Sequence, residues 1–172
     1  MTPPPEWLLP LVLLEDCGGD WDKYIELLYS FFKDDFASNT IFYKAEKVIL
    51  KRGPLVKGKE VTFWHLLEGG SLPGLRRCER IRWVRAIIEN SDNPSIKVWE
   101  NERKNEKRVC LWYEEEDYLV VLAKRKGYCI LWTAYFIDKE HTKEKLRKEY
   151  EAYKKADAAT KDGIVTPSTR GR

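Results

Sequence analysis

Apolar residues in the first half of the chain recur every three or four positions, which is the spacing of one face of an α-helix. This pattern predicts a first helix from Asp20, whose carboxylate can cap the first turn, to about Phe36. A second helix is predicted over residues 75–89, because the segment 90–94 ends in proline and stops it. The apolar stretch at 61–67 fits either a strand or a short helix.

Beyond residue 94 the apolar period changes from about 3.6 to 2, which predicts strands instead of helices. Four successive strands are expected, and their connections are too short for parallel crossovers, so they form an antiparallel meander. The strands span 96–102, 107–114, 118–123 and 128–138. The acidic cluster at 114–117 falls in one of the connections and is expected to be a solvated turn.

These elements predict a single α+β domain over residues 20–156. It has N-terminal helices, then a four-stranded antiparallel meander sheet, then a C-terminal helix over about residues 141–155. The Pro-rich segment 1–19 is expected to be an irregular arm. The segment 157–172, rich in Thr, Gly, Pro and Ala, is expected to be a disordered tail.

The composition argues against several classes of protein. The longest apolar run, 128–137, is too short for a bilayer, which needs about 20 residues as a helix. No Lys or Arg precedes Lys23, so the basic start of a signal peptide is missing, and a cytoplasmic protein is expected. Four widely spaced cysteines and two histidines predict neither a metal site nor another cofactor. The motifs G-x-S-x-G, G-x-x-x-x-G-K, G-x-G-x-x-G and H-E-x-x-H are absent.

A net charge of +3 conceals one strongly basic segment, at residues 76–85, which holds five arginines and a single acid. A guanidinium can hold a phosphate with two hydrogen bonds and can stack on a base. This helix, together with Trp83, is therefore a candidate RNA-binding surface. The alternative is a solvated, salt-bridged helix face. The arginines are Arg76, Arg77, Arg80, Arg82 and Arg85.

Two histidines and a lysine are further candidates for chemistry. His65 lies among aromatic residues, and an imidazole can give and take protons at neutral pH. The alternative is a core histidine bonded to a backbone carbonyl. Lys139 and His141 lie at the junction with the last helix, whose N-terminal amides can bind an anion.

The last predicted strand places two hydroxyl groups close together. With strict alternation, Thr133 and Tyr135 share one face with Cys129, Leu131 and Ile137. Two hydroxyls on one face can bind a phosphate. Thr and Tyr are also ordinary strand formers, so a half-exposed strand without a binding role remains the alternative.

Short motifs occur along the chain in a particular order: Phe63-Trp64-His65-Leu66, the arginine run 77–83, the helix end 87–90, the strand 117–122, and Trp132-Thr133-Ala134-Tyr135. In this order they resemble the barnase–EndoU–colicin–RelE superfamily of metal-independent ribonucleases, in its phage-associated branch. The resemblance covers about residues 40–155 and implies a barnase/RelE-like fold with a four-stranded antiparallel sheet.

The resemblance further implies an endoribonuclease, of toxin or phage-defence type, that cleaves RNA by attack of a 2′-hydroxyl on the adjacent phosphate. It gives His65 an acid/base role, Arg80 a phosphate-stabilising role, and Thr133 and Tyr135 contacts with phosphate or ribose. His141 is the candidate second proton-transfer group. RNA is the expected partner, together with an antitoxin or immunity protein. The alternatives are a non-catalytic RNA- or protein-binding module with the same fold, and a phage accessory protein.

Overall fold

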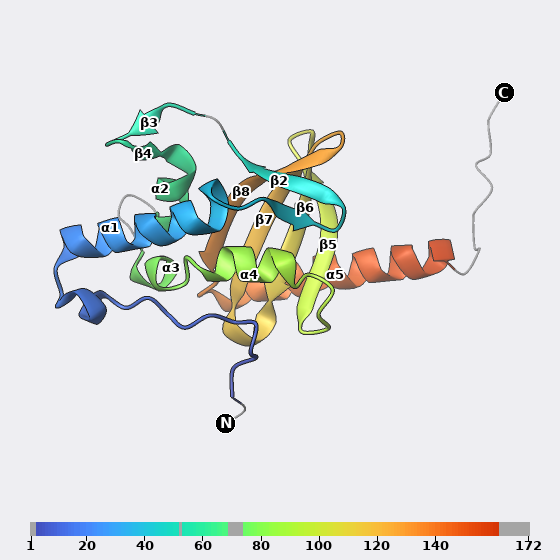
Figure 1. Ribbon diagram of the computed structural model, residues 1–172. Coiled ribbons are helices and arrows are strands. Elements are labelled where there is room, and N and C mark those ends of the chain that lie inside the picture. Colours follow the sequence, from blue (N-terminus) through green and yellow to red (C-terminus); the bar gives the residue numbers. More distant parts are fainter. Residues whose placement is uncertain (1–2, 52, 69–73, 162–172) are drawn as a thin grey trace.

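The computed structural model describes residues 3–51, 53–68 and 74–161 as a curled sheet with helices around it (Figure 1). The six strands follow the order β1-β2-β8-β7-β6-β5, and only β2 and β8 pair in parallel. The strands are β1 (Ile41–Tyr43), β2 (Glu46–Leu50), β5 (Ile96–Arg103), β6 (Glu106–Tyr113), β7 (Tyr118–Lys124) and β8 (Tyr128–Phe136). A separate small hairpin joins β3 (Leu55–Val56) to β4 (Lys59–Glu60).

The helices surround the sheet on three sides. α1 and α4 lie over one face, α5 crosses the other face, and α2 and α3 pack against β8. The helices are α1 (Trp21–Phe32), α2 (Val61–Leu67), α3 (Leu75–Glu79), α4 (Trp83–Glu89) and α5 (Glu140–Lys161). Three single turns complete the set: η1 (Leu14–Cys17), the π-helical η2 (Lys33–Ala37) that extends α1, and η3 (Glu114–Glu116).

The prediction of a four-stranded antiparallel sheet is wrong. The meander β5–β8 is present, but the hairpin β1–β2 adds two strands at the edge of β8 and makes the sheet mixed. Lys47 pairs with Tyr128 and Leu50 with Leu131, so the added strands are joined by contacts between distant parts of the chain. A local hydrophobic period carries no information about such pairing.

The single second helix predicted over residues 75–89 is also wrong, because α3 and α4 are separated by a turn at Arg80–Arg82. The turn lets the Arg80 guanidinium lie 5.0 Å from the Trp83 ring and 5.1 Å from the Phe136 ring. The first helix agrees with its prediction. Asp20 accepts a hydrogen bond from the Lys23 amide at 3.2 Å and caps α1.

The described part of the N-terminal arm packs onto the domain. Leu8 and Val12 are buried in the core. The Tyr24 hydroxyl donates to the Val12 carbonyl at 2.7 Å, and the Trp83 indole donates to the Leu9 carbonyl at 2.7 Å. At the other end, residues 157–161 of the predicted tail belong to α5, and residues 162–172 lie outside the described residues.

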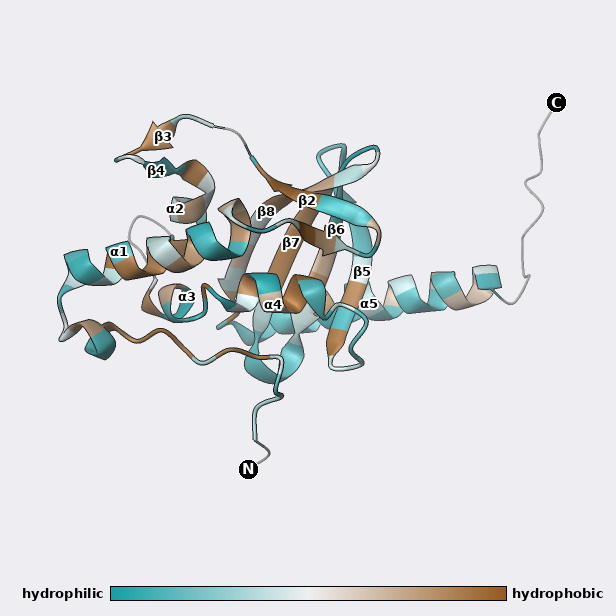
Figure 2. Ribbon diagram, in the orientation of Figure 1, coloured by the Kyte–Doolittle hydropathy of each residue, from teal (hydrophilic) through white to brown (hydrophobic). Residues whose placement is uncertain are grey.

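The two faces of the sheet are covered in different ways (Figure 2). The face under α1 and α4 carries a large apolar cluster. The opposite face carries a smaller cluster around Trp99 and Trp112, and α5 contributes only one buried residue to it, Leu146. Figure 2 accordingly shows α5 as largely hydrophilic. In the described chain, no helix combines the length and apolar character needed to cross a membrane.

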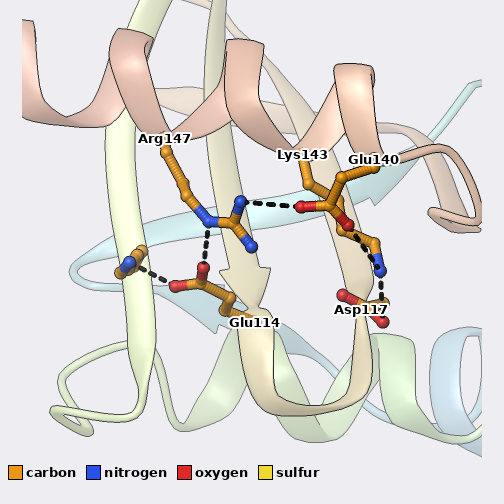
Figure 3. Close-up of polar contacts among 6 residues, drawn as sticks. Glu114, Asp117, Glu140, Lys143 and Arg147 are labelled. Atoms are coloured by element: carbon orange, nitrogen blue, oxygen red, sulfur yellow. Dashed lines mark hydrogen bonds and ion pairs between the residues drawn. The ribbon is translucent and has the colours of Figure 1, made fainter.

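Ion pairs attach α5 to the sheet where apolar contacts are few (Figure 3). Arg147 donates through Nε to Glu114 at 2.6 Å and through Nη1 to Glu140 at 3.1 Å. Lys97 also pairs with Glu114, and Lys143 donates to Asp117 at 2.8 Å. The segment 114–117 forms a turn with Glu115 and Glu116 exposed, as expected, but Glu114 and Asp117 also hold basic side chains from the helix.

Candidate functional site

A bulge in β8 defines the surface on which the predicted hydroxyls lie. Val121 pairs with Thr133 and Leu122 pairs with Leu131, so Trp132 is an extra residue without a partner in β7. A bulge shifts the alternation of side chains along a strand. Leu131 consequently packs into the cluster under α1 and α4, whereas Trp132 lies on the α5 face. The prediction of strict alternation is wrong for this strand.

The bulged half of β8 lies at an open part of the sheet edge. β2 pairs only with residues 128–131, and α2 and α3 pack against β8. This arrangement brings α2 to Thr133. A cavity of about 220 Å³ lies between them and is lined by Lys51, Thr62, His65, Leu131, Trp132 and Thr133.

His65 is an accessible side chain, so it is not the buried core histidine of the alternative interpretation. Its side chain is 57% exposed, and Nδ1 lies 4.0 Å from Oε2 of Glu68 one turn later on the chain. An exposed imidazole can exchange protons with a molecule bound beside it. His65 and Thr133 therefore face one accessible cavity.

Arg77 connects this cavity to Tyr135. Its Nη1 donates to the His65 carbonyl at 3.5 Å, and its guanidinium carbon lies 5.2 Å from the centre of the Tyr135 ring. Burial lowers the pKa of Arg77 from its ordinary value, but a guanidinium remains protonated at neutral pH. Burial raises the pKa of Tyr135, so its phenol keeps its proton and can donate a hydrogen bond.

A second cavity, of about 150 Å³, adjoins the first: Trp132 and Thr133 line both, and Tyr135 lines the second. Trp132 lies between two cations, with Lys51 Nζ at 5.4 Å and the Arg108 guanidinium at 5.2 Å from the ring centre. The site is therefore basic and aromatic, a combination typical of single-stranded nucleic-acid surfaces.

A third, open cavity of about 830 Å³ lies beyond Arg77, at the end of β8. Arg76, Arg77, Lys139 and Lys143 line it together with Asp117 and Asp138. Arg76 lies 4.8 Å from the centre of the Phe136 ring, and Lys143 is already paired with Asp117. Lys139 and Arg76, both predicted to bind RNA, thus lie on the same surface as Arg77.

The other basic residues of the run are not part of this surface. Arg80 is buried, donates to the Arg76 carbonyl at 3.0 Å and pairs with Glu79 at 3.3 Å. Because the helix breaks at Arg80–Arg82, the five predicted arginines do not form one stripe.

Arg82 and Arg85 turn toward α1 and η2. Arg82 lies 4.5 Å from the Phe31 ring and 4.0 Å from Asp35, and Arg85 donates to Glu89 at 3.0 Å. Trp83 is 4% exposed and bonded to the arm, so it offers no face to a base.

His141 lies apart from His65. It is exposed in the first turn of α5, and it does not line any of the three cavities described above. The described residues hold no group of three or more His, Cys, Asp or Glu side chains arranged to bind a metal ion.

Several residues of the site were not predicted from the sequence: Lys51, Asn101, Arg103, Arg108 and the outward-facing Trp132. Lys51 follows directly after the apolar stretch of β2, but nothing in the local sequence shows that β2 pairs with β8. Arg108 and Asn101 could have been placed on one face, because the two-residue turn at Lys104-Asn105 sets them opposite each other.

No family model, no curated protein and no solved structure matches this chain. The class of the site therefore follows from its own geometry. It is a basic, aromatic cleft at a bulged sheet edge, with one accessible histidine and two hydroxyl groups.

Proposed function

We propose that this protein is an endoribonuclease that needs no metal ion and cleaves RNA by attack of a 2′-hydroxyl on the adjacent phosphate. The observation that carries the proposal is the shared cavity of His65 and Thr133, with Arg77 bonded to the His65 backbone and lying against Tyr135. This reaction needs a base for the 2′-hydroxyl, a proton for the 5′-oxygen and cations for the charge that develops on phosphorus.

The residues of the cavity, together with Arg77 beside it, can fill these roles. His65 takes the proton of the 2′-hydroxyl. Arg77 and Lys51 stabilise the charge on the phosphate oxygens, and Thr133 donates a hydrogen bond to one of them. Arg77 thus replaces Arg80 in the phosphate-stabilising role, because the Arg80 guanidinium is buried and bonded to backbone and to Glu79.

The leaving 5′-oxygen must be protonated, either by a second acid or by His65 after it has taken the proton of the 2′-hydroxyl. His141 does not line the cavity, so we assign this step to His65 itself. His65 becomes an imidazolium when it takes the proton of the 2′-hydroxyl, and it then donates a proton to the leaving 5′-oxygen. Tyr135, whose pKa is raised by burial, holds the phosphate or ribose as a neutral hydrogen-bond donor. The net result is a 2′,3′-cyclic phosphate and a free 5′-hydroxyl.

The test is cleavage of transfer and messenger RNA by the purified full chain in EDTA. His65→Ala should reduce the rate by about 10²- to 10⁴-fold, the usual contribution of a positioned acid or base. His141→Ala is the matched control, because it removes the only other histidine and lies outside the cavity. Equal losses in the two variants, or cleavage by His65→Ala at the normal rate, would contradict the proposal.

RNA that is bound with a steep dependence on salt but not cleaved would favour the alternative of a binding module with the same cleft. If the protein is a toxin or a phage-defence enzyme, the cells that produce it need an inhibitor of its ribonuclease activity. An antitoxin or immunity protein that covers Lys51, Arg77 and His65 with acidic side chains is the partner that this proposal implies.

A further inference from the structure

α5 covers only part of the sheet face on which it lies. The apolar cluster beneath it draws its sheet residues from β5, β6, β7, the bulged part of β8 and the residue after β8. Among the described residues, no member of this cluster comes from β1 or β2. These two strands lie outside the four-stranded sheet expected from the sequence, and they extend the sheet beyond β8 (Figure 1). The hairpin β1–β2 therefore gives this chain an additional surface beside the proposed site.

Three side chains form a row across this surface. Phe42 of β1 pairs with Lys47 of β2, and Lys47 pairs with Tyr128 of β8. Val48 and Cys129, the next residues along β2 and β8, are buried in the cluster under α1 and α4, so alternation turns the row to the opposite face. Phe42 is 51% exposed and Tyr128 is 37% exposed. Two large aromatic side chains that remain open to solvent on one row indicate a surface for a partner.

The charge on this surface is positive. β1, β2 and β8 contain a single acidic residue, Glu46, whose carboxylate accepts a hydrogen bond from the buried Cys129 Sγ at 3.2 Å. Lys47 lies between the two aromatic residues of the row, and Lys44 and Lys126 are exposed in the two turns at the same end of the strands. A purely apolar partner would bury Lys47 without a counter-charge, which is unfavourable. Aromatic rings with lysines between them match the bases and phosphates of a single-stranded nucleic acid.

The row is continuous with the cavity that contains His65. Trp132 lies four residues after Tyr128 on β8, about 13 Å along the strand, and it lines that cavity together with Lys51. Lys51 Nζ lies 5.4 Å from the centre of the Trp132 ring. Phe42 and Tyr128 are two strands apart, which is about 10 Å. A strand of RNA can therefore pass from the cavity over Trp132 to Tyr128 and Phe42.

We infer that the outer face of β1, β2 and the first half of β8 binds single-stranded RNA, with bases stacked on Phe42 and Tyr128 and a phosphate held by Lys47. The inference rests on the proposed ribonuclease function, because the bound strand continues into the His65 cavity. Stacking needs bases that are not paired with a second strand, so this surface selects single-stranded RNA over duplex RNA. It does not read the sequence, because every base has a face that can stack.

The test is fluorescence anisotropy of the full chain with labelled 2′-O-methyl RNA, which lacks the nucleophile of the proposed reaction and so reports binding alone. A single-stranded dodecamer should bind more tightly than the same sequence in a duplex. Phe42→Ala and Tyr128→Ala should each weaken binding of the single strand by about 5- to 150-fold, the effect of losing one stacked base. Tyr128→Phe keeps the ring and should bind as the parent protein does. Trp21→Ala is the matched control, because Trp21 is 38% exposed on α1, which covers the opposite face of the sheet.

Lys47→Gln adds a measurement that a folding defect would not imitate. Loss of one phosphate contact should reduce the slope of log affinity against log salt concentration by about 0.7 for a single strand. An unchanged slope, or parent-like binding by both alanine variants, would overturn the inference. Self-association in sedimentation that disappears in Phe42→Ala would also overturn it, because the surface would then join two copies of the chain. Ring-dependent binding without cleavage of natural RNA would support the surface and overturn the proposed reaction, whereas cleavage with unchanged binding in the variants would do the reverse.

Discussion

Replacing Glu114 with glutamine tests whether charge holds α5 on the sheet. The Glu114 carboxylate accepts hydrogen bonds from Arg147 Nε at 2.6 Å and from Lys97. Burial opposes its ionisation, but the hydrogen bonds from Lys97 and Arg147 outweigh that effect and hold the pKa of Glu114 below its ordinary value. The variant keeps the shape and one acceptor oxygen, and it loses only the negative charge between two cations.

The three side chains are 27%, 40% and 29% exposed for Glu114, Arg147 and Lys97, so solvent screens both ion pairs. A pair of this kind contributes about 0.2–1 kcal/mol, and two pairs give a loss of about 1 kcal/mol. For a domain of this length that corresponds to a melting temperature lower by about 2–4 °C. The local stability of α5 against opening should fall by more than the global stability, because Leu146 is the single buried residue of this helix.

The pH dependence of this loss has a definite sign. A carboxyl group with a lowered folded-state pKa stabilises the fold above its unfolded value of about 4.3, and this stabilisation disappears as the pH falls through the folded-state pKa. Glu114→Gln lacks this contribution. The variant should therefore be less stable than the parent protein at pH 7, and the difference should close in acid.

The assay is thermal melting at pH 7 and pH 3, combined with amide hydrogen exchange along α5. Glu116→Gln is the control, since Glu116 is exposed in the same turn, η3. Equal melting temperatures of the two variants at pH 7, or amide exchange in α5 no faster in Glu114→Gln than in the parent protein, would contradict this prediction.

Substitution of two other buried groups should raise the stability of the protein instead of lowering it. Tyr118 is 0% exposed and its hydroxyl has no partner among the described residues, so Tyr118→Phe should raise stability by up to about 1 kcal/mol; a lower melting temperature would contradict this. Burial raises the pKa of Asp35 despite the nearby Arg82 and Arg85. The ionised carboxylate therefore destabilises the fold, and this effect grows as the pH rises from about 4, the unfolded-state pKa, to the higher folded-state pKa. Asp35→Asn should therefore be more stable than the parent in urea unfolding at pH 7 and equal to it below pH 4, and an equal gain at both pH values would refute the assignment.

The elements that the sequence predicts well are those with a local cause. α1 follows from the Asp20 cap and a regular apolar face, and the strands of the meander follow from their period and short connections. β1 and β2 were missed as part of the sheet because their partner is β8, from the other end of the domain. Pairing of this kind is decided by packing, which no window of sequence contains.

The candidate site shows a similar division between local and long-range causes. His65, Thr133 and Tyr135 could be chosen by residue type, and the structure places all three around adjoining cavities. The sequence alone does not show which arginines are buried and which lie at the site. Arg80 and Arg77 both belong to the same basic run, but the turn after α3 buries Arg80 between aromatic rings and leaves Arg77 beside His65.

The bulge at Trp132 joins the fold to the proposed chemistry. Without the extra residue, a regular strand would put Thr133 and Leu131 on one face, and the core would have to accept a hydroxyl or lose a leucine. With it, Leu131 remains in the core, and Trp132 and Thr133 both reach the cavities beside α2 and α5. A bulge is kept where it re-aims side chains. Here it places the Thr133 hydroxyl on the lining of both the His65 cavity and the pocket beneath α5.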